Sequence, residues 1–302
     1  MYSLWHHIAS SSHRHRWVAS DFWPPTGRCP NEAALLADGT VVTWGSSFAG
    51  GDSSAVRAQL YDVEAIQATR QAFAARRRDG SVVSWGSEDY GARPSVLQDV
   101  AELAASFRSF AAILLDGRVV TWGPADCGGD SQAVRDQLTQ VKQIQSTWQA
   151  FAALKTDGSV VTWGDPSSGG DSRCVKERLR NVIQIAATSR AFAALRADGE
   201  VVTWGLQEFG GDSSKVQHQL AQVTHIQAGG QSFAALRSDG RVVSWGHHSI
   251  DLRRVQDFRH VQSIGASRSA FAATTADGKV VTWGNASEGG DSGAVQDELQ
   301  CL

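Results

Sequence analysis

A phrase made of Asp-Gly, two valines and Trp-Gly recurs seven times along the chain and constrains its fold more than any other feature. Its tryptophans are Trp44, Trp85, Trp122, Trp163, Trp204, Trp245 and Trp283. They follow one another at intervals of 41, 37, 41, 41, 41 and 38 residues. A period near forty residues is typical of repeat architectures, in which each unit buries its apolar face against its neighbours. We therefore expect one cooperative domain, although 302 residues would suffice for two.

Residues 141–175 illustrate the internal pattern of one unit. Val141 and Ile144 begin a short apolar strand, and residues 151–154 form a second one. Asp157-Gly158 follows, a dipeptide that supplies the positive φ angles of a tight hairpin turn. Residues 160–163 read Val-Val-Thr-Trp and form a third strand, because β-branched and aromatic side chains favour strands.

The second strand of six units carries Phe followed by two alanines, which predicts how the sheets pack. These residues are Phe73, Phe110, Phe151, Phe192, Phe233 and Phe271. Alanine lets neighbouring sheets approach closely, while the Phe and Trp rings fill the space between them. No unit has a stretch of helical periodicity long enough for a helical solenoid. The sequence therefore predicts an all-β fold, a seven-bladed β-propeller built from seven repeats of about 41 residues.

A loop ending in Gly-Gly-Asp-Ser follows Trp-Gly in five units. The segment behind it fits either a single helical turn capped by the Asp or Ser, or an irregular outer strand, and we favour the capped turn. The repeated aspartates are Asp52, Asp130, Asp171, Asp212 and Asp291. Equivalent positions lie a blade apart in a ring, so these carboxylates are expected to cap turns rather than to converge as a catalytic pair.

The order of these motifs resembles the repeats of the regulator of chromosome condensation (RCC) family, which form seven-bladed β-propellers. The resemblance covers about residues 31–302. Two features depart from the family pattern: Gly-Gly-Asp-Ser replaces the usual Gly-Gln-Leu-Gly loop, and the units are about ten residues shorter. The resemblance implies a propeller that acts as a non-enzymatic scaffold for protein–protein interaction. It also allows two alternative functions: a substrate-recognition or regulatory fragment of a HECT-type ubiquitin ligase, or a guanine nucleotide exchange factor for a Ran-like small GTPase.

The first thirty residues lack the repeat pattern, and we expect residues 1–30 to be an ill-defined, partly disordered leader before a propeller at 31–302. His6, His7, His13 and His15 could bind a metal, but nothing fixes their geometry, so a flexible polar tail is the interpretation. Residues 17–19 look like a degenerate first strand, and the last unit stops before its next strand. A blade shared between the two termini would remove exposed sheet edges.

Composition and motifs exclude several functions. The net charge of −3 gives no basic field for nucleic acid, and four scattered cysteines favour neither a zinc site nor a disulfide framework. No apolar run approaches the eighteen or so residues of a membrane span. Phosphate-binding and nucleophile-elbow motifs are absent from the sequence. We expect a soluble, intracellular, cytoplasmic or nuclear protein that is monomeric and is not an enzyme, without cofactor or metal.

Partner binding is expected on the loops of the second and sixth units, which drop Gly-Gly-Asp and are shorter than the others. Tyr, Arg and exposed Ile are side chains that anchor interfaces. The partner-binding residues predicted here, for a protein of unknown identity, are Glu88, Asp89, Tyr90, Arg93, His247, His248, Ile250 and Arg254. Arg76, Arg77 and Arg78 form a basic hairpin tip, interpreted as solvated surface, with an acidic partner as the alternative.

Overall fold

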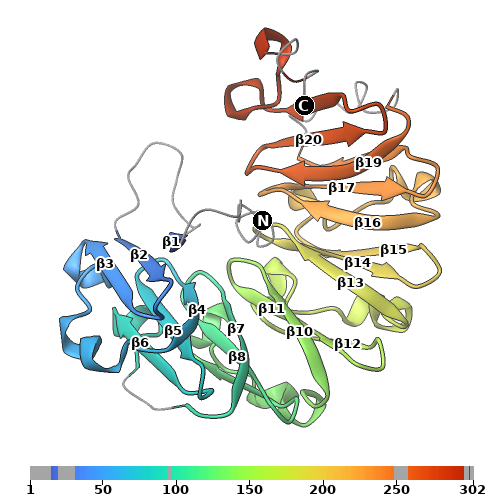
Figure 1. The fold of residues 1–302 in the computed structure, drawn as a ribbon. Coiled ribbons are helices and arrows are strands. Elements are labelled where there is room, and N and C mark those ends of the chain that lie inside the picture. Colours follow the sequence, from blue (N-terminus) through green and yellow to red (C-terminus); the bar gives the residue numbers. More distant parts are fainter. Residues whose placement is uncertain (1–14, 20–30, 94–96, 248–257, 296–298, 300–302) are drawn as a thin grey trace. The chain divides into compact units, whose positions relative to one another are not determined.

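The computed structural model describes the whole chain except residues 1–14, 20–30, 94–96, 248–257, 296–298 and 300–302. It contains seven three-stranded sheets, one for each Trp-Gly repeat, and each sheet joins three consecutive strands in chain order (Figure 1). The prediction of an all-β chain with seven blades is therefore confirmed. The first four sheets belong to one compact part of the chain, and the last three sheets, with the loop from residue 167 onward, belong to a second.

The strands of the first four sheets are β1 (His15–Ala19), β2 (Asn31–Leu36), β3 (Val41–Gly45), β4 (Val63–Ala68), β5 (Ala72–Arg77), β6 (Val82–Gly86), β7 (Val100–Ala105), β8 (Phe110–Leu114), β9 (Val119–Trp122), β10 (Val141–Ser146), β11 (Ala150–Lys155) and β12 (Val160–Gly164). Those of the last three sheets are β13 (Val182–Ala187), β14 (Ala191–Arg196), β15 (Val201–Gly205), β16 (Val223–Ala228), β17 (Ser232–Arg237), β18 (Val242–Gly246), β19 (Val261–Ala266), β20 (Ala270–Thr275) and β21 (Val280–Gly284).

Short 3₁₀ helices occupy the loops between the sheets. They are η1 (Ser47–Ala49), η2 (Ser54–Gln59), η3 (Glu88–Tyr90), η4 (Ala125–Cys127), η5 (Gln132–Gln137), η6 (Pro166–Ser168), η7 (Arg173–Arg178), η8 (Gln207–Phe209), η9 (Gln217–Gln219), η10 (Ala286–Glu288) and η11 (Gly293–Val295). The helical turn expected behind Gly-Gly-Asp-Ser is thus observed instead of an outer strand. The N-cap residue of η2 is Ser53, whose side chain makes no capping hydrogen bond; the Asp52 carboxylate, one position earlier, accepts the backbone N–H of Ser54 at 2.8 Å.

Strand β1 lies within the segment predicted to be a leader. It pairs antiparallel with β2, with Trp17 opposite Ala34, so residues 15–19 supply the first strand of the first sheet. This agrees with the degenerate strand expected around residues 17–19. The rest of the leader, including the histidine cluster, lies outside the described residues except for His15. The division into leader and propeller and the shared blade at the termini stay predictions.

The Asp-Gly dipeptides form the expected hairpin turns, but the turn type differs from the one predicted. In the β2–β3 hairpin the Gly39 N–H donates to Leu36 O and the Leu36 N–H donates to Thr40 O. Gly39 has φ +80°, whereas Asp38 has no positive φ, so only the glycine adopts the left-handed conformation. This is a longer loop built on a type I turn. The Asp38 carboxylate accepts the Thr40 N–H at 2.9 Å, which explains why Asp precedes each glycine.

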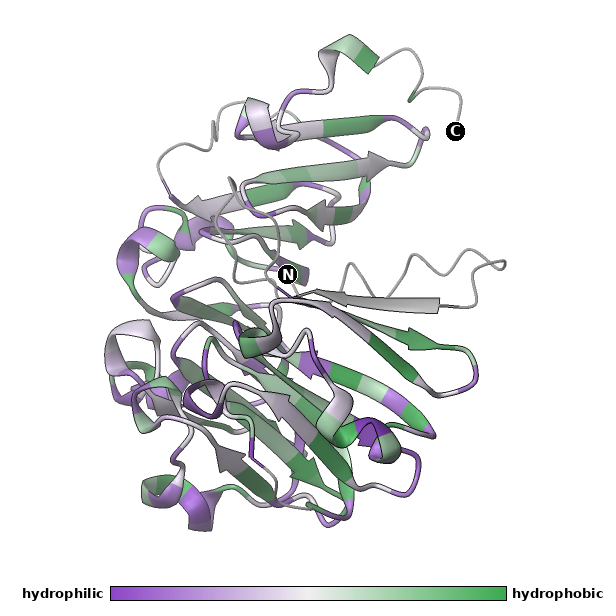
Figure 2. Ribbon diagram, turned by 90° about the vertical axis from the view of Figure 1, so that its left-hand side faces the viewer, coloured by the Kyte–Doolittle hydropathy of each residue, from purple (hydrophilic) through white to green (hydrophobic). Residues whose placement is uncertain are grey.

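The apolar residues concentrate in the strands, and the loops between them are mostly polar (Figure 2). The core lies between consecutive sheets: Phe233 and Trp245 of the sixth sheet pack against Ala193, Leu195 and Val201 of the fifth. Alanines on the middle strand leave room for the rings of the neighbouring sheet, as expected from the sequence.

Five of the motif tryptophans bond a glycine in the loop that follows the preceding sheet, whereas Trp283 donates to the Ser244 hydroxyl at 3.1 Å. Trp204 stacks on Phe192, its cross-strand neighbour, with 5.2 Å between the ring centroids, and its indole N–H donates to Gly169 O at 3.0 Å. Gly169 packs so closely on the Phe192 ring that an added Cβ would lie 2.6 Å from a ring carbon. Four further indoles, those of Trp85, Trp122, Trp163 and Trp245, donate to the equivalent glycines at 2.9–3.1 Å. The same contact forms at a spacing of 35 residues in four pairs and 31 residues in the Gly91–Trp122 pair, so it depends on the two residues and not on one loop length.

Candidate functional site

The second-unit loop predicted to bind a partner begins with the 3₁₀ helix η3. Glu88 and Asp89 are exposed and Tyr90 is half-buried, while Gly91 ends the helix with φ +90°. Arg93 is exposed, and both its backbone N–H and its carbonyl bond to the Ser84 hydroxyl. The structure therefore presents these predicted residues on the surface, with Tyr90 fixed against the protein.

The sixth-unit loop is described only at its start. His247 is exposed, and its backbone N–H donates to Gln231 O at 3.1 Å. His248, Ile250 and Arg254 lie outside the described residues. The two predicted loops belong to different compact parts of the chain. Their joint contact with one partner stays a prediction.

Tyr90 belongs to a cluster of rings and guanidinium groups that we call the aromatic–arginine surface, formed by Arg70, Tyr90, Phe107, Arg108 and Trp148. The Phe107 ring lies 6.2 Å from that of Tyr90, edge-on, and 6.1 Å from that of Trp148. The guanidinium of Arg70 lies 5.4 Å from the Phe107 ring centre, and that of Arg108 lies 5.1 Å from the Tyr90 ring centre. All five side chains are half-buried. Rings and guanidinium groups at these distances attract one another.

The short turns between the first two strands of the second, third and fourth sheets position this surface. Each turn begins with a buried hydroxyl residue; Thr69 accepts the Ala72 N–H at 3.1 Å and donates to Tyr90 O at 2.9 Å. The middle residues then bond through their backbones from sheet to sheet. The Arg70 N–H donates to Phe107 O at 3.0 Å, and the Phe107 N–H donates to Trp148 O at 2.9 Å. Arg70, Phe107 and Trp148 therefore stand in a fixed row.

The same turns in the second compact part carry Ser189, Gly230 and Arg268 at their middle positions. The Ser189 N–H donates to Gly230 O at 2.9 Å, and the Gly230 N–H donates to Arg268 O, so the backbone pattern repeats without aromatic side chains. Because the scaffold is equivalent, the rings of the second to fourth sheets are not needed for the turn itself. This difference singles out the aromatic–arginine surface as the candidate functional site.

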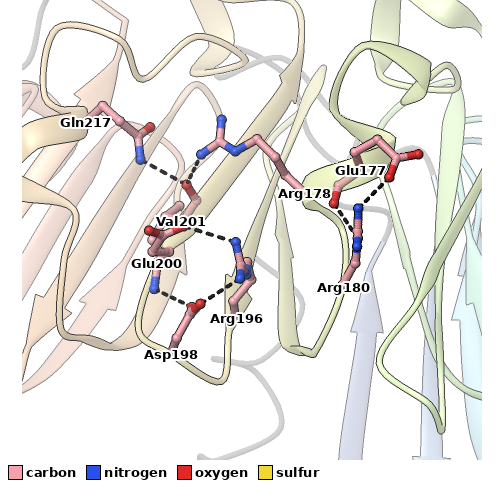
Figure 3. Close-up of polar contacts among 8 residues, drawn as sticks. All are labelled: Glu177, Arg178, Arg180, Arg196, Asp198, Glu200, Val201 and Gln217. Carbon is pink, nitrogen blue, oxygen red and sulfur yellow. Dashed lines mark hydrogen bonds and ion pairs between the residues drawn. The ribbon is translucent and has the colours of Figure 1, made fainter.

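Other arginine clusters are neutralised by neighbouring carboxylates. In the fifth sheet Arg196 pairs with Asp198 at 2.6 Å and with Glu200 at 3.0 Å, and Arg180 pairs with Glu177 (Figure 3). Surface ion pairs of this kind contribute little to stability, and they leave no excess positive charge here.

Two further side chains in this region cap a strand edge. Arg178 and Gln217 both donate to the carbonyl of Val201 at the start of β15, at 3.4 and 3.2 Å (Figure 3). The edge of β15 is thus covered by side chains of two successive loops, which protects it against pairing with another strand.

The basic tip of the second unit is also paired within the protein. Arg76 and Arg78 both bond Glu64, at 3.0 and 3.3 Å, and Arg77 pairs with Asp79 at 3.2 Å. The carboxylates offset much of the charge that suggested an acidic partner. Only the Arg78 side chain is largely solvated, at 76% exposed, because Arg76 and Arg77 lie in β5 and their side chains are 21% and 15% exposed.

Burial raises the pKa of the Cys127 thiol to about 11, so this cysteine stays protonated near neutral pH. Among the residues with assigned positions, no three His, Cys, Asp or Glu side chains are grouped to hold a metal ion. No helix in the same residues is long and apolar enough to cross a membrane.

Sequence analysis predicted Tyr90 but missed the other four residues of the surface. These four residues lie in the turns between the first two strands of their sheets, where they leave the repeated sequence motif unchanged. A usable signal existed: the middle of this turn changes from Arg70 to Phe107 and Trp148 while the flanking residues stay nearly the same. Variation at one position of a constant scaffold is typical of binding loops.

No family model matches the chain, and the comparison with curated proteins finds no match either. Among solved structures, it is similar to Prp20p, the RCC1 protein of Saccharomyces cerevisiae, with 18% identity, 74% of this chain and 72% of that chain covered, and a TM-score of 0.47. It is also similar to the CRINKLY WD40 ectodomain of the Arabidopsis thaliana receptor kinase ACR4, with 16% identity, 84% and 90% covered, and a TM-score of 0.48. The expected resemblance to RCC-type proteins is thus found in structures as well. The seven-sheet fold itself rests on the strand pairing of this chain.

Proposed function

We propose that the chain is a non-enzymatic scaffold that binds a protein partner through the aromatic–arginine surface. The observation that supports this most is the fixed row of Arg70, Phe107 and Trp148, joined by Tyr90 and Arg108. The equivalent turns of the second compact part form the same backbone hydrogen bonds without an aromatic residue. Tyr, Trp and Arg are the side chains that most often dominate binding energy in protein interfaces. Their positions are set before binding, which lowers the entropy lost on association.

Two more specific functions follow from the resemblance to the RCC family. Recognition of substrates for a HECT-type ubiquitin ligase would use such a surface without further chemistry in this chain. Exchange on a Ran-like GTPase would need an element that displaces the nucleotide, and the short repeats leave no room for an inserted wedge. A monomeric, intracellular protein with the sixth-unit loop as a second contact is part of the same proposal.

Quantitative affinity capture with the full chain tests the proposal. The double variant Tyr90→Ala, Phe107→Ala should lose at least tenfold of any specific partner relative to the unmodified chain, because two anchors are removed. Leu115→Ala is the matched control: this residue is 73% exposed and follows the opposite end of the same strand, β8. Equal capture by the double variant and the unmodified chain would exclude this surface as the partner site.

A further inference from the structure

We propose that the aromatic–arginine surface binds a peptide segment of the partner in which one oxyanion, a carboxylate or a phosphate, stands next to an apolar side chain. This inference rests on the proposed function and adds the chemistry that the partner must carry. Three observations support it: the row of rings, the orientation of the two guanidinium groups, and the carboxylates at the border.

The rings supply the apolar half of the site. Tyr90, Phe107 and Trp148 come from three successive sheets and are each only partly covered, so a continuous aromatic row reaches the solvent. The Tyr90 and Phe107 planes meet at 62° and those of Phe107 and Trp148 at 33°, which leaves ring edges and faces at different inclinations. An apolar side chain of a peptide can pack between such rings and bury a large area at low entropic cost.

The guanidinium groups supply the polar half. Arg70 lies over the Phe107 ring and Arg108 over the Tyr90 ring. A guanidinium held over an aromatic ring keeps N–H donors at its edge, where they match the two oxygens of a carboxylate or phosphate. The Arg108 side chain is held further because its Nε–H donates to Asp89 O at 3.2 Å. Arg108 therefore presents its guanidinium donors with much of the side chain's rotamer freedom already lost.

The carboxylate beside Arg108 is one that a ligand can displace. The Arg108–Asp126 pair is 3.7 Å long, and the Asp126 side chain is 65% exposed. By contrast, Arg196 holds two carboxylates at 2.6 and 3.0 Å. A partner oxyanion with two close hydrogen bonds would compete well with the long, solvated Asp126 contact.

The border of the surface limits how acidic the partner can be. Glu88, Asp89 and Asp126 are all exposed around Tyr90 and Arg108. A tract of many acidic residues would be repelled by these carboxylates, whereas a single oxyanion beside an apolar residue gains from both halves of the site. This favours one acidic or phosphorylated residue in an otherwise apolar segment.

Fluorescence anisotropy with the full chain and short labelled peptides tests the inference. The peptides share one sequence and differ at a central residue, which is Glu, phosphoserine or Gln, and at the next residue, which is Leu or Gly. With Leu present, the Glu peptide or the phosphoserine peptide should bind at least about fivefold tighter than the Gln peptide. The tighter binder of the Glu and phosphoserine peptides then shows whether the site prefers a carboxylate or a phosphate. Replacing Leu by Gly should weaken every peptide.

Variants assign the effect to the surface. Arg108→Gln should reduce the preference over Gln to less than about twofold, whereas Arg173→Gln, which alters an 86% exposed arginine paired with Asp171, should leave it unchanged. Circular dichroism confirms that each variant is folded. Equal binding of Glu, phosphoserine and Gln peptides, no binding by any of them, or a preference that survives Arg108→Gln would each overturn the inference. If the captured partner still depends on Tyr90 and Phe107 in such a case, the proposed function stands and only the oxyanion chemistry fails.

Discussion

Trp163→Ala should be among the most destabilising single changes in the chain. The Trp163 side chain is 4% exposed, its ring stacks on Phe151 at 5.2 Å, and its indole N–H donates to Gly128 O at 3.0 Å. Truncation leaves a cavity between two sheets and removes the donor from a buried carbonyl. Comparable truncations of buried aromatic residues cost about 3–5 kcal/mol.

Two further variants separate the contributions. Trp163→Phe keeps a ring against Phe151 but leaves Gly128 O without its donor, so about 1–3 kcal/mol should be lost. Trp148→Ala, in the same repeat, removes a half-buried ring from the surface and should cost about 1 kcal/mol. Equilibrium unfolding in guanidinium chloride, followed by far-ultraviolet circular dichroism, measures all three. If Trp148→Ala costs as much as Trp163→Ala, the core has been placed wrongly; if Trp163→Phe is neutral, the indole hydrogen bond does not tie the sheets together.

Three other predictions address the turns and the activity. Hydrogen bonds lower the pKa of several aspartates. The Ser54 N–H lowers the pKa of Asp52, and the hydrogen bond from Lys279 lowers the pKa of Asp277 to about 2. Because a lowered folded-state pKa stabilises the fold above the unfolded value of 3.8, the denaturation midpoint should stay level near neutral pH and fall between about pH 4 and 2; a midpoint independent of pH there would contradict this. Gln140 has φ +56°, so Gln140→Gly should be more stable than Gln140→Val by about 1–2 kcal/mol in thermal unfolding, and the reverse order would contradict the left-handed backbone. The purified chain should not accelerate the release of labelled GDP from a Ran-like GTPase, and a concentration-dependent rise would refute the non-enzymatic proposal.

The fold was predictable because the same turn and strand motifs recur along the chain. Seven copies of Asp-Gly and Val-Val-x-Trp-Gly locate the hairpins and the third strands, and Phe-Ala-Ala locates the middle strand between close neighbours. The turn type was not predictable in the same way, since Asp-Gly fits both a two-residue loop and the longer loop found around Gly39.

The candidate site was only partly predictable, for a spatial reason. Tyr90 stands in an irregular loop that attracts notice, whereas Phe107 and Trp148 stand in short turns 41 residues apart and meet only through the stacking of successive sheets. The hydrogen bond from five of the Trp indoles to a glycine carbonyl of the preceding loop was equally hard to predict, because no residue in the sequence marks which carbonyl accepts from the indole.

Hydrogen–deuterium exchange of the full chain with its captured partner reports where the partner binds. Partner binding at the aromatic–arginine surface should slow exchange at residues 69–71, 88–91, 106–109 and 147–149, which carry or flank this surface, and leave exchange unchanged at the Asp-Gly tips around Gly80 and Gly117. Protection confined to those tips, with the four surface segments exchanging as in the free protein, would contradict binding at this surface.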